Sequence, residues 1–200
     1  MSDLKRIGIL GGTFDPLHLG HLIIASHAAD GLDLDQVLFM PAQIPPHKLD
    51  LVITDTAHRV EMVQRGIRDD DRFAVSDLDL RRDAPSYTSE LVARLAKELP
   101  GTALHFIAGA DSLRDFPTWH EPREILKHAE LAIAARPGTS ITDEMLESVP
   151  TLRTRTRIFE SPLIDISSTT IRNRVHHGRS IRYLVPADVE TYIEEHGLYS

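Results

Sequence analysis

Short aliphatic runs alternate with longer amphipathic stretches along most of this chain. The runs are bounded by Gly, Pro or polar residues and are typical of strands buried on both faces; they are residues 6–10, 36–41, 73–76, 104–108 and 131–135. Helices are predicted between them, at residues 19–31, 54–68, 88–99, 122–128 and 142–149. This order predicts right-handed crossovers and a parallel sheet with helices on both faces.

The pattern changes after residues 158–159. Ile166 leads into SSTTIRNRVHHG, which predicts a helix closed by Gly178, and residues 186–195 form a last amphipathic helix. No linker-like composition separates this tail from the rest. The chain is therefore predicted to be one α/β domain, residues 1–200. It would have a Rossmann-like, doubly wound parallel sheet over residues 1–160 and a small C-terminal helical cap over residues 161–200.

Composition limits the function classes. The net charge of −8 over 200 residues disfavours nonspecific nucleic-acid binding but leaves a small anionic ligand open. The absence of cysteine excludes disulfides, thiolate catalysis and cysteine-bound metals. The N-terminus does not resemble a secretory signal, and no apolar run approaches the about 18 residues of a membrane span. We expect a cytoplasmic protein with no membrane partner; a homo-oligomer is left open.

The first strand runs directly into the string GGTFDPLHLGH, residues 11–21. Ligands of open parallel sheets bind beyond the carboxyl ends of the strands, which is where this bend lies. Gly11 and Gly12 allow a close backbone approach and positive φ, and the following helix directs its free N–H groups at the same place. His18 and His21 share one helix face and can donate to phosphate oxygens. The alternatives are a plain turn with two surface histidines, or a zinc pair that lacks a third ligand.

A second string, ISSTTIR at residues 166–172, places a run of hydroxyl side chains before a helix. One such residue suffices for an N-cap, and capping alone is the simpler interpretation. The additional hydroxyls, the exposed N–H groups and Arg172 one turn later also suit an anion. Two such strings in one chain predict a polyphosphate ligand or a pair of phosphorylated substrates.

Together, GGTFDPLHLGH and ISSTTIR resemble the two signatures of the HxGH nucleotidylyltransferase superfamily. Within it the chain is most similar to bacterial nicotinate-mononucleotide adenylyltransferases. The strings that carry this resemblance are PPHK at 45–48, HR at 58–59, SYTSEL at 86–91, GADSL at 109–113, Trp119-His120 and ARPG at 135–138. They cover most of the chain in the expected order.

The resemblance implies that ATP lies across the end of the first strand. The residues it assigns to ATP are Gly11, Gly12, Thr13, Phe14, His18, Gly20, His21, Gly109, Asp111, Ser167, Ser168, Thr169 and Arg172. For Gly109 and Asp111 the alternative is a glycine that ends a strand and an aspartate that caps a helix.

The resemblance also implies an acceptor, nicotinate mononucleotide. The residues it assigns to this substrate are Thr13, Phe14, Lys48, Tyr87, Thr88, Trp119 and Arg136. An aromatic face such as that of Trp119 suits stacking on a pyridine ring, although a tryptophan in a loop is often a packing anchor. Arg59 is expected to pair locally on its own helix, near Glu61.

The implied reaction is attack by the phosphate of nicotinate mononucleotide on the α-phosphorus of ATP, which releases pyrophosphate. Because the attacking group is already an anion, no general base is needed, and catalysis rests on positioning and charge stabilisation. The catalytic assignments are His18 and Arg172 on the bridging and transferred phosphate, His21 on the triphosphate, and Lys48 for phosphate neutralisation. Mg²⁺ is expected to arrive with ATP, bound through phosphates and water, with no protein metal site.

Three alternatives stay open from the residues. The same chemistry could act on nicotinamide mononucleotide or on phosphopantetheine, although PPHK and the Trp119 loop argue against the latter. The scaffold could also serve as a non-catalytic nucleotide sensor, which would be expected to lose a histidine or Arg172. The preference for the acid over the amide rests on resemblance alone.

Overall fold

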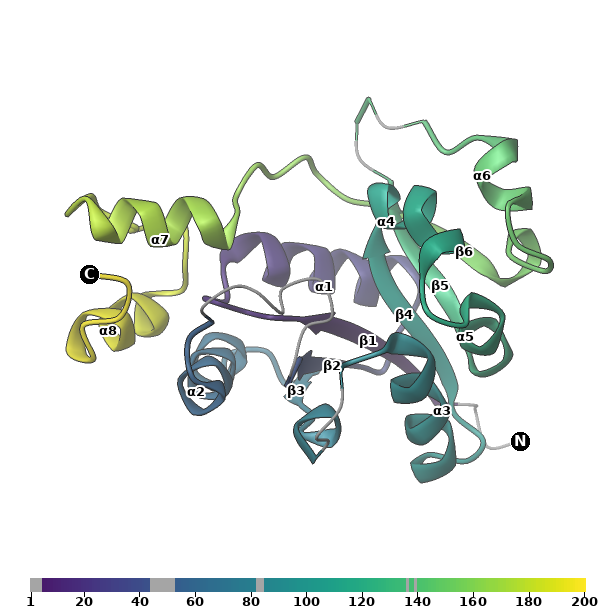
Figure 1. The fold of residues 1–200 in the computed structure, drawn as a ribbon, viewed down its shortest axis with the longest axis horizontal. Helices are drawn as coiled ribbons and strands as arrows, with labels where there is room; N and C mark the ends of the chain where they lie inside the picture. Colours follow the sequence, from purple (N-terminus) through teal and green to yellow (C-terminus); the bar gives the residue numbers. More distant parts are fainter. Residues whose placement is uncertain (1–4, 44–52, 82–84, 136, 139) are drawn as a thin grey trace.

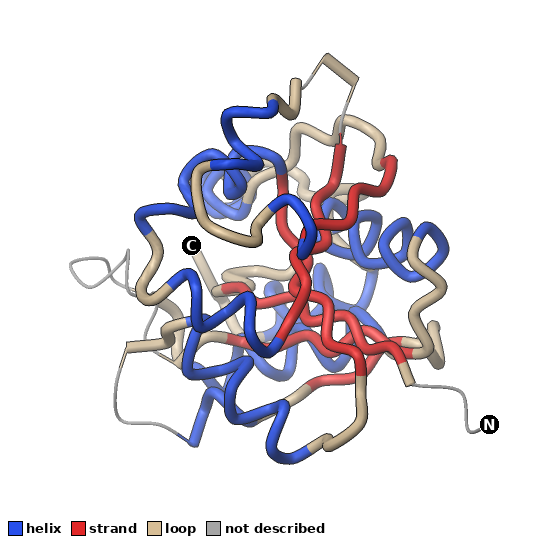
Figure 2. The backbone as a smooth tube through the Cα atoms, turned by 90° about the vertical axis from the view of Figure 1, so that its right-hand side faces the viewer, coloured by secondary structure: helices blue, strands red, loops and turns tan. Residues whose placement is uncertain are grey.

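Six parallel strands form one sheet in the order β3-β2-β1-β4-β5-β6 (Figure 1). The computed structural model describes residues 5–43, 53–81, 85–135, 137–138 and 140–200. The strands are β1 Arg6–Gly12, β2 Gln36–Pro41, β3 Phe73–Val75, β4 Ala103–Gly109, β5 Ala129–Ala135 and β6 Thr156–Glu160. In Figure 2 they run between helices that lie on both sides. The predicted α/β, doubly wound parallel sheet is confirmed.

The helices follow the predicted periodicity to within two residues at each end. They are α1 Leu19–Gly31, α2 Thr56–Ile67, α3 Thr88–Glu98, α4 Ala110–Asp115, α5 Pro122–His128, α6 Asp143–Glu147, α7 Ser168–His176 and α8 Ala187–Glu195. Three short 3₁₀ turns complete the described elements, at Leu78–Arg81, Phe116–Thr118 and Arg153–Arg155. Within the described ranges, no helix combines the length and apolar character needed to cross a membrane.

Two elements were not predicted, β6 and α4. Only Phe159 of β6 is buried, and Ile158 is half exposed, so this edge strand lacks the apolar run that marks the inner strands. Helix α4 has six residues, too few to show a helical period, and begins directly after β4 with Gly109 as its N-cap. Both follow from tertiary context rather than from local pattern.

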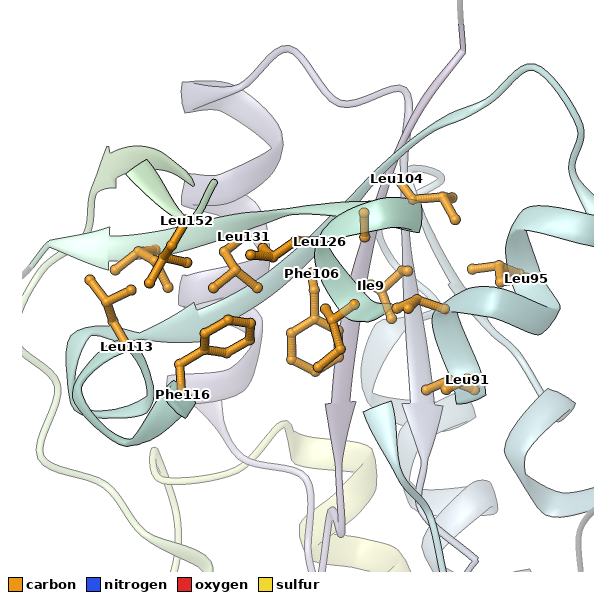
Figure 3. Close-up of a cluster of buried hydrophobic side chains, with 14 of the residues drawn as sticks. Ile9, Leu91, Leu95, Leu104, Phe106, Leu113, Phe116, Leu126, Leu131 and Leu152 are labelled. Carbon is orange, nitrogen blue, oxygen red and sulfur yellow. The ribbon is translucent and has the colours of Figure 1, made fainter. Parts of the chain in front are cut away.

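Each face of the sheet buries its own apolar cluster, because successive residues of a strand point to opposite sides. Ile7 and Ile9 of β1 face the cluster beneath α3, α4 and α5, together with Phe106 of β4, Leu131 of β5 and Leu113 of α4 (Figure 3). The opposite face carries a second cluster beneath α1 and α2. Its members include Leu10, Val37, Phe39, Val63 and Ile107.

Helix α1 packs on the sheet through small residues. Its buried positions are Ala25, Ala28 and Ala29, and the same cluster contains Ala132 and Ala134 of β5. Small side chains on both partners let the helix axis lie close to the strands. The N-terminus of α1 is thereby held beside the carboxyl end of β1.

Helices α7 and α8 lie at one end of the molecule, beyond α1 and α2 (Figure 1). Their apolar side chains form a third cluster with Met62 of α2, which contains Ile171, Val189, Tyr192 and Ile193. The cap therefore rests on α2 through its own small core. The division of the chain at residue 160 remains a prediction.

Gly66 of α2 lies where the helix meets both the first bend and α8. A Cβ atom at this position would collide with Leu17 and would approach Val189 Cγ2 to 3.2 Å and Pro186 Cγ to 3.3 Å.

We predict that Gly66→Ala lowers the free energy of unfolding by about 1–3 kcal/mol, because overpacking outweighs the better helix propensity of alanine. Urea denaturation measures the change. The exposed Gln64→Ala on the same helix is the control and should stay within about 0.5 kcal/mol of wild type. A stabilised Gly66→Ala would contradict the close packing.

Candidate active site

A cavity of about 1050 Å³ opens at the carboxyl ends of β1, β2 and β4. β1 pairs with both β2 and β4, so the chain reverses its direction of winding at this point. Such a reversal leaves a crevice in which doubly wound proteins bind their ligands. The wall contains residues from the end of each of these strands: Leu10, Gly11 and Gly12 of β1, Met40 of β2 and Gly109 of β4.

The bend after β1 and the hydroxyl-rich turn before α7 meet at this cavity. Ser168 Oγ donates to the carbonyl oxygen of Pro16 at 2.9 Å, and Arg172 Nη1 donates to that of Asp15 at 2.7 Å. Residues of both segments line the wall, among them His18, His21 and Thr169. Segments some 150 residues apart are thus brought to one hollow, as predicted from the two strings.

His18 and His21 stack against each other at the start of α1. Their ring centroids are 3.6 Å apart with an interplanar angle of 19°. The backbone N–H of His18 donates to His21 Nδ1 at 3.2 Å, which places the His21 proton on Nε2. Among the residues that the structure describes, the buried Nδ1 atom of His18 has no hydrogen-bond partner, and the His18 side chain belongs to the cavity wall.

The imidazole of His18 is neutral at neutral pH. The residue is 7% exposed, and burial lowers the pKa of His18 from its ordinary value to about 4, because desolvation disfavours the charged form. A neutral imidazole can still donate one hydrogen bond, as the sequence-based assignment to phosphate oxygens requires.

Two glycines beside these histidines leave little room for a larger residue. A Cβ at Gly20 would lie 3.1 Å from His18 Nδ1, and one at Gly12 would lie 3.0 Å from the Phe14 ring. The positive φ predicted for Gly11 and Gly12 is wrong, because both lie inside β1. The left-handed residue of the bend is Phe14, with φ of 50°.

The hydroxyl side chains at the start of α7 make different hydrogen bonds. Ser167 caps the helix by accepting from Thr170 N at 3.1 Å, so capping is part of its role. Ser168 bonds to the bend, and Thr169 Oγ1 accepts from Arg172 Nη2 at 3.3 Å. Because Ser167, Ser168 and Thr169 all line the cavity, the first turn of α7 also presents its backbone N–H groups there.

Aromatic side chains line the other side of the cavity. Tyr87 stacks on His120 with centroids 4.2 Å apart, and Trp119 packs edge-on against Phe106 at 5.7 Å. Tyr87, Thr88 and Trp119 all contribute to the wall, as the acceptor assignment requires. Trp119 is both a packing anchor of the core and a wall residue, so the two interpretations of it are compatible.

Several predicted residues do not line the cavity. The Phe14 side chain lies in the core, so it could meet a ligand only through its backbone. Asp111 is exposed and pairs with Arg114 at 3.3 Å. Arg172 holds the bend as described above, and the lining residues do not include it. Lys48 and Arg136 lie outside the described residues.

Arg59 corrects an expectation. It is 1% exposed and bonds mainly outside its own helix, because its guanidinium donates to the backbone oxygens of Thr13, Ala42 and Thr54, each at 2.9 Å. Its only side-chain bond within α2 reaches Thr56 Oγ1 at 2.8 Å, and none is made near Glu61 among the described residues. Arg59 therefore ties the first bend to both ends of the segment that precedes α2.

Six further wall residues were not assigned from the sequence: Asp79, Ser86, Ser112, His120, Glu121 and Ser161. Ser86, Ser112 and His120 lie within the strings that carry the resemblance, so those strings could have indicated them. Asp79, Glu121 and Ser161 lie in none of these strings; Asp79 is buried and accepts from Gln43 N at 3.1 Å. Among the described wall residues there is no lysine or arginine, and the N-termini of the helices that border the cavity contribute positive potential there.

Comparison with known proteins defines the class first. Residues 9–174 match the family model described as cytidylyltransferase-like, a match that spans most of the chain and includes both cavity strings. The fold and the cavity therefore belong to a nucleotidyltransferase.

Closer relatives define the particular family. The chain is 46% identical over 197 residues to a probable nicotinate-nucleotide adenylyltransferase of Thermomicrobium roseum, covering 98% of this chain and 92% of the relative. A relative of the same name in Thermus thermophilus is 45% identical over 194 residues, covering 97% and 99%. This chain belongs to the nicotinate-nucleotide adenylyltransferase family.

A solved structure has the same fold. The Plasmodium falciparum nicotinic acid mononucleotide adenylyltransferase complexed with NaAD superposes with a TM-score of 0.81 at 20% identity, covering 98% of this chain and 97% of that one. At this identity the likeness concerns the fold.

The pKa of His18 predicts a pH-dependent stability. His18 has a pKa of about 6.5 in the unfolded chain and about 4 in the folded one, so the unfolded chain binds more protons between these values. The free energy of unfolding is therefore highest above pH 6.5 and decreases as the pH falls toward 4. The contribution of His18 to this decrease is up to about 3 kcal/mol.

We predict that the unfolding free energy of His18→Asn changes less between pH 7 and 4 than that of wild type. Urea denaturation across this range measures the difference. The pKa of His105 is also lowered by burial, but His105 is present in both proteins, so its contribution cancels in the comparison. Identical pH profiles would contradict a neutral buried His18.

Proposed function

We propose that this protein transfers the adenylyl group of ATP to nicotinate mononucleotide, giving nicotinate adenine dinucleotide and pyrophosphate, a step of NAD biosynthesis. Family membership supports the activity, and one structural observation carries the assignment to this cavity. The His18–His21 pair and the Ser167–Thr169 turn line the same hollow at the switch point of the sheet. A cytoplasmic location, where ATP is available, is part of the proposal.

The chemistry requires orientation rather than a base. The phosphate oxygen of the mononucleotide attacks the α-phosphorus, and the bond to the bridging oxygen of pyrophosphate breaks. We assign His18 to the transferred phosphate and His21 to the triphosphate as hydrogen-bond donors. The N-termini of α1 and α7 add backbone N–H groups and favourable dipole ends for the charge of the transition state. Lys48 remains assigned to phosphate neutralisation by resemblance.

Arg172 is assigned differently from the sequence-based prediction. Its guanidinium bonds Asp15 and Thr169, which fixes the bend relative to α7. We therefore propose that it acts mainly by positioning the two phosphate-binding segments. A direct contact with the triphosphate would require these bonds to rearrange.

The acid preference gains support from α3. Tyr87, its N-cap residue, makes no side-chain capping bond, and the first turn of the helix borders the cavity at Thr88. The N–H groups of this turn and the positive end of the dipole favour a carboxylate over a neutral amide. Trp119, on the same side, would provide a face for the pyridine ring.

Mg²⁺ is the divalent ion proposed with ATP. Within the part of the chain that the structure describes, no three His, Asp or Glu side chains cluster as a metal site. Mg²⁺ usually binds to nucleotides through substrate phosphates and water rather than through a dedicated set of protein ligands. When bound, it would neutralise charge on the β- and γ-phosphates.

We predict pyrophosphate release from ATP, Mg²⁺ and nicotinate mononucleotide, with kcat/KM at least about tenfold higher than with nicotinamide mononucleotide. The reason is that α3 favours the carboxylate over the neutral amide, and tenfold corresponds to about 1.4 kcal/mol. A coupled pyrophosphate assay compares both substrates and phosphopantetheine. Equal rates with acid and amide would contradict the α3 assignment. No turnover with any acceptor, but ATP binding, would favour the nucleotide sensor.

His18→Ala should lower kcat by at least about 100-fold, because it removes a preorganised donor at the reacting phosphate. The matched control is His27→Ala on the same helix, whose exposed side chain bonds the Glu160 carbonyl oxygen away from the cavity wall. It should retain wild-type turnover. Steady-state kinetics with circular dichroism of each variant separates catalysis from folding, and unchanged turnover in His18→Ala would refute its role.

A further inference from the structure

The bend between β1 and α1 is held by side chains from distant elements. Arg59 of α2 bonds the carbonyl oxygen of Thr13, Arg172 that of Asp15, and Ser168 that of Pro16. These three bonds engage the backbone. The side chain of Asp15 needs partners of its own, because it is a carboxylate only 3% exposed.

The main partner of that carboxylate is Tyr199, in the segment after α8. The Tyr199 hydroxyl donates to Asp15 Oδ1 at 2.6 Å, while Thr54 N approaches Oδ2 at 3.4 Å. Burial, and then the neighbouring carboxylate, raise the pKa of Tyr199 above its ordinary value. The hydroxyl therefore remains a donor throughout the working pH range.

The backbone of Tyr199 is strained as well, with φ of 67° in the left-handed region. Such a conformation is uncommon in a bulky residue, although Tyr183 also adopts it, so the role of Tyr199 is inferred from the contacts of its side chain. Here the side chain is held by the bond to Asp15. The hydroxyl lies also 4.0 Å from Met62 Sδ, at the edge of the cap's own core.

We propose that Tyr199 is a positioning residue for adenylyl transfer, which acts by orienting Asp15 and with it the bend that leads to His18. Asp15 lies three residues before His18, and its carbonyl oxygen carries the bond from Arg172 of α7. Asp15 thus connects the histidine pair to the hydroxyl-rich turn before α7. The inference rests on the proposed function.

Neither partner is a catalytic residue. Tyr199 and Asp15 are not among the residues that line the cavity, so they do not touch a substrate bound there. Their effect must pass through the geometry of the bend. A small displacement of a binding group is enough to slow a reaction that depends on alignment.

The test is Tyr199→Phe, which keeps the ring and removes only the hydroxyl. The control is Tyr183→Phe, the same change at a side chain that is 82% exposed. We expect kcat and kcat/KM of Tyr199→Phe to fall in parallel by at least tenfold, while KM for ATP stays unchanged. The assays are run well below the melting temperature of each variant. Wild-type kcat, or a rise in KM alone, would overturn the proposal.

Asp15→Asn and the double variant show whether the two residues act together. If Tyr199 acts through Asp15, the double variant loses no more activity than Asp15→Asn alone, whereas independent losses would multiply and overturn the proposal.

A readout independent of turnover keeps this inference separate from the proposed function. The NMR titration of the His18 ring should move toward the ordinary histidine midpoint in Tyr199→Phe and stay unchanged in Tyr183→Phe. Wild-type turnover tests the proposed reaction by itself, so an inactive wild type would refute the reaction, while an unmoved His18 titration would refute the positioning role.

Discussion

The structure depends on how the bend between β1 and α1 is held. Its backbone oxygens are bonded by Arg59, Ser168 and Arg172, and its carboxylate by Tyr199. A bend of this kind cannot satisfy its polar groups through sheet or helix bonds, so side chains from elsewhere must do so. Because these come from α2, α7 and the segment after α8, the cap is tied to the end of the sheet where the cavity opens. Folding of the cap and assembly of the cavity are therefore coupled.

Local pattern predicted the elements that bury apolar residues periodically, including five of the strands, the doubly wound sheet and the meeting of the two cavity strings. It failed where tertiary contact decides. Strand β6 is an edge strand with one buried side chain, and Arg59 bonds backbone oxygens that its own helix does not contain. A long cationic side chain reaches over several ångströms, so its partner cannot be read from neighbours in the sequence. The neutral state of His18 likewise depends on burial by residues distant in the chain.

In the described part of the cavity wall, oriented backbone N–H groups rather than cationic side chains provide the positive potential. The described wall contains Asp79 and Glu121 but no lysine or arginine, while the starts of α1, α3, α4 and α7 border it. Partial charges of helix ends are fixed in direction and need no reorganisation when charge moves between phosphates. A neutral His18 adds a donor without adding a full charge to the site. The arrangement suits a reaction in which negative charge is redistributed rather than created.

The two sides of the cavity are built differently, and this separates chemistry from substrate choice. On one side, the starts of α1 and α7 are connected through the bend, so a change there disturbs several segments at once. On the other side, Tyr87 stacks on His120 and Trp119 packs against Phe106. Under the proposed function, the first side would bind the phosphates and the second would bind the acceptor. Substitution of these rings would alter the fit of the acceptor while the alignment of the phosphates stays intact. A scaffold organised in this way can serve different acceptors with one mode of phosphoryl transfer, because the constraints on the two halves are carried by different residues.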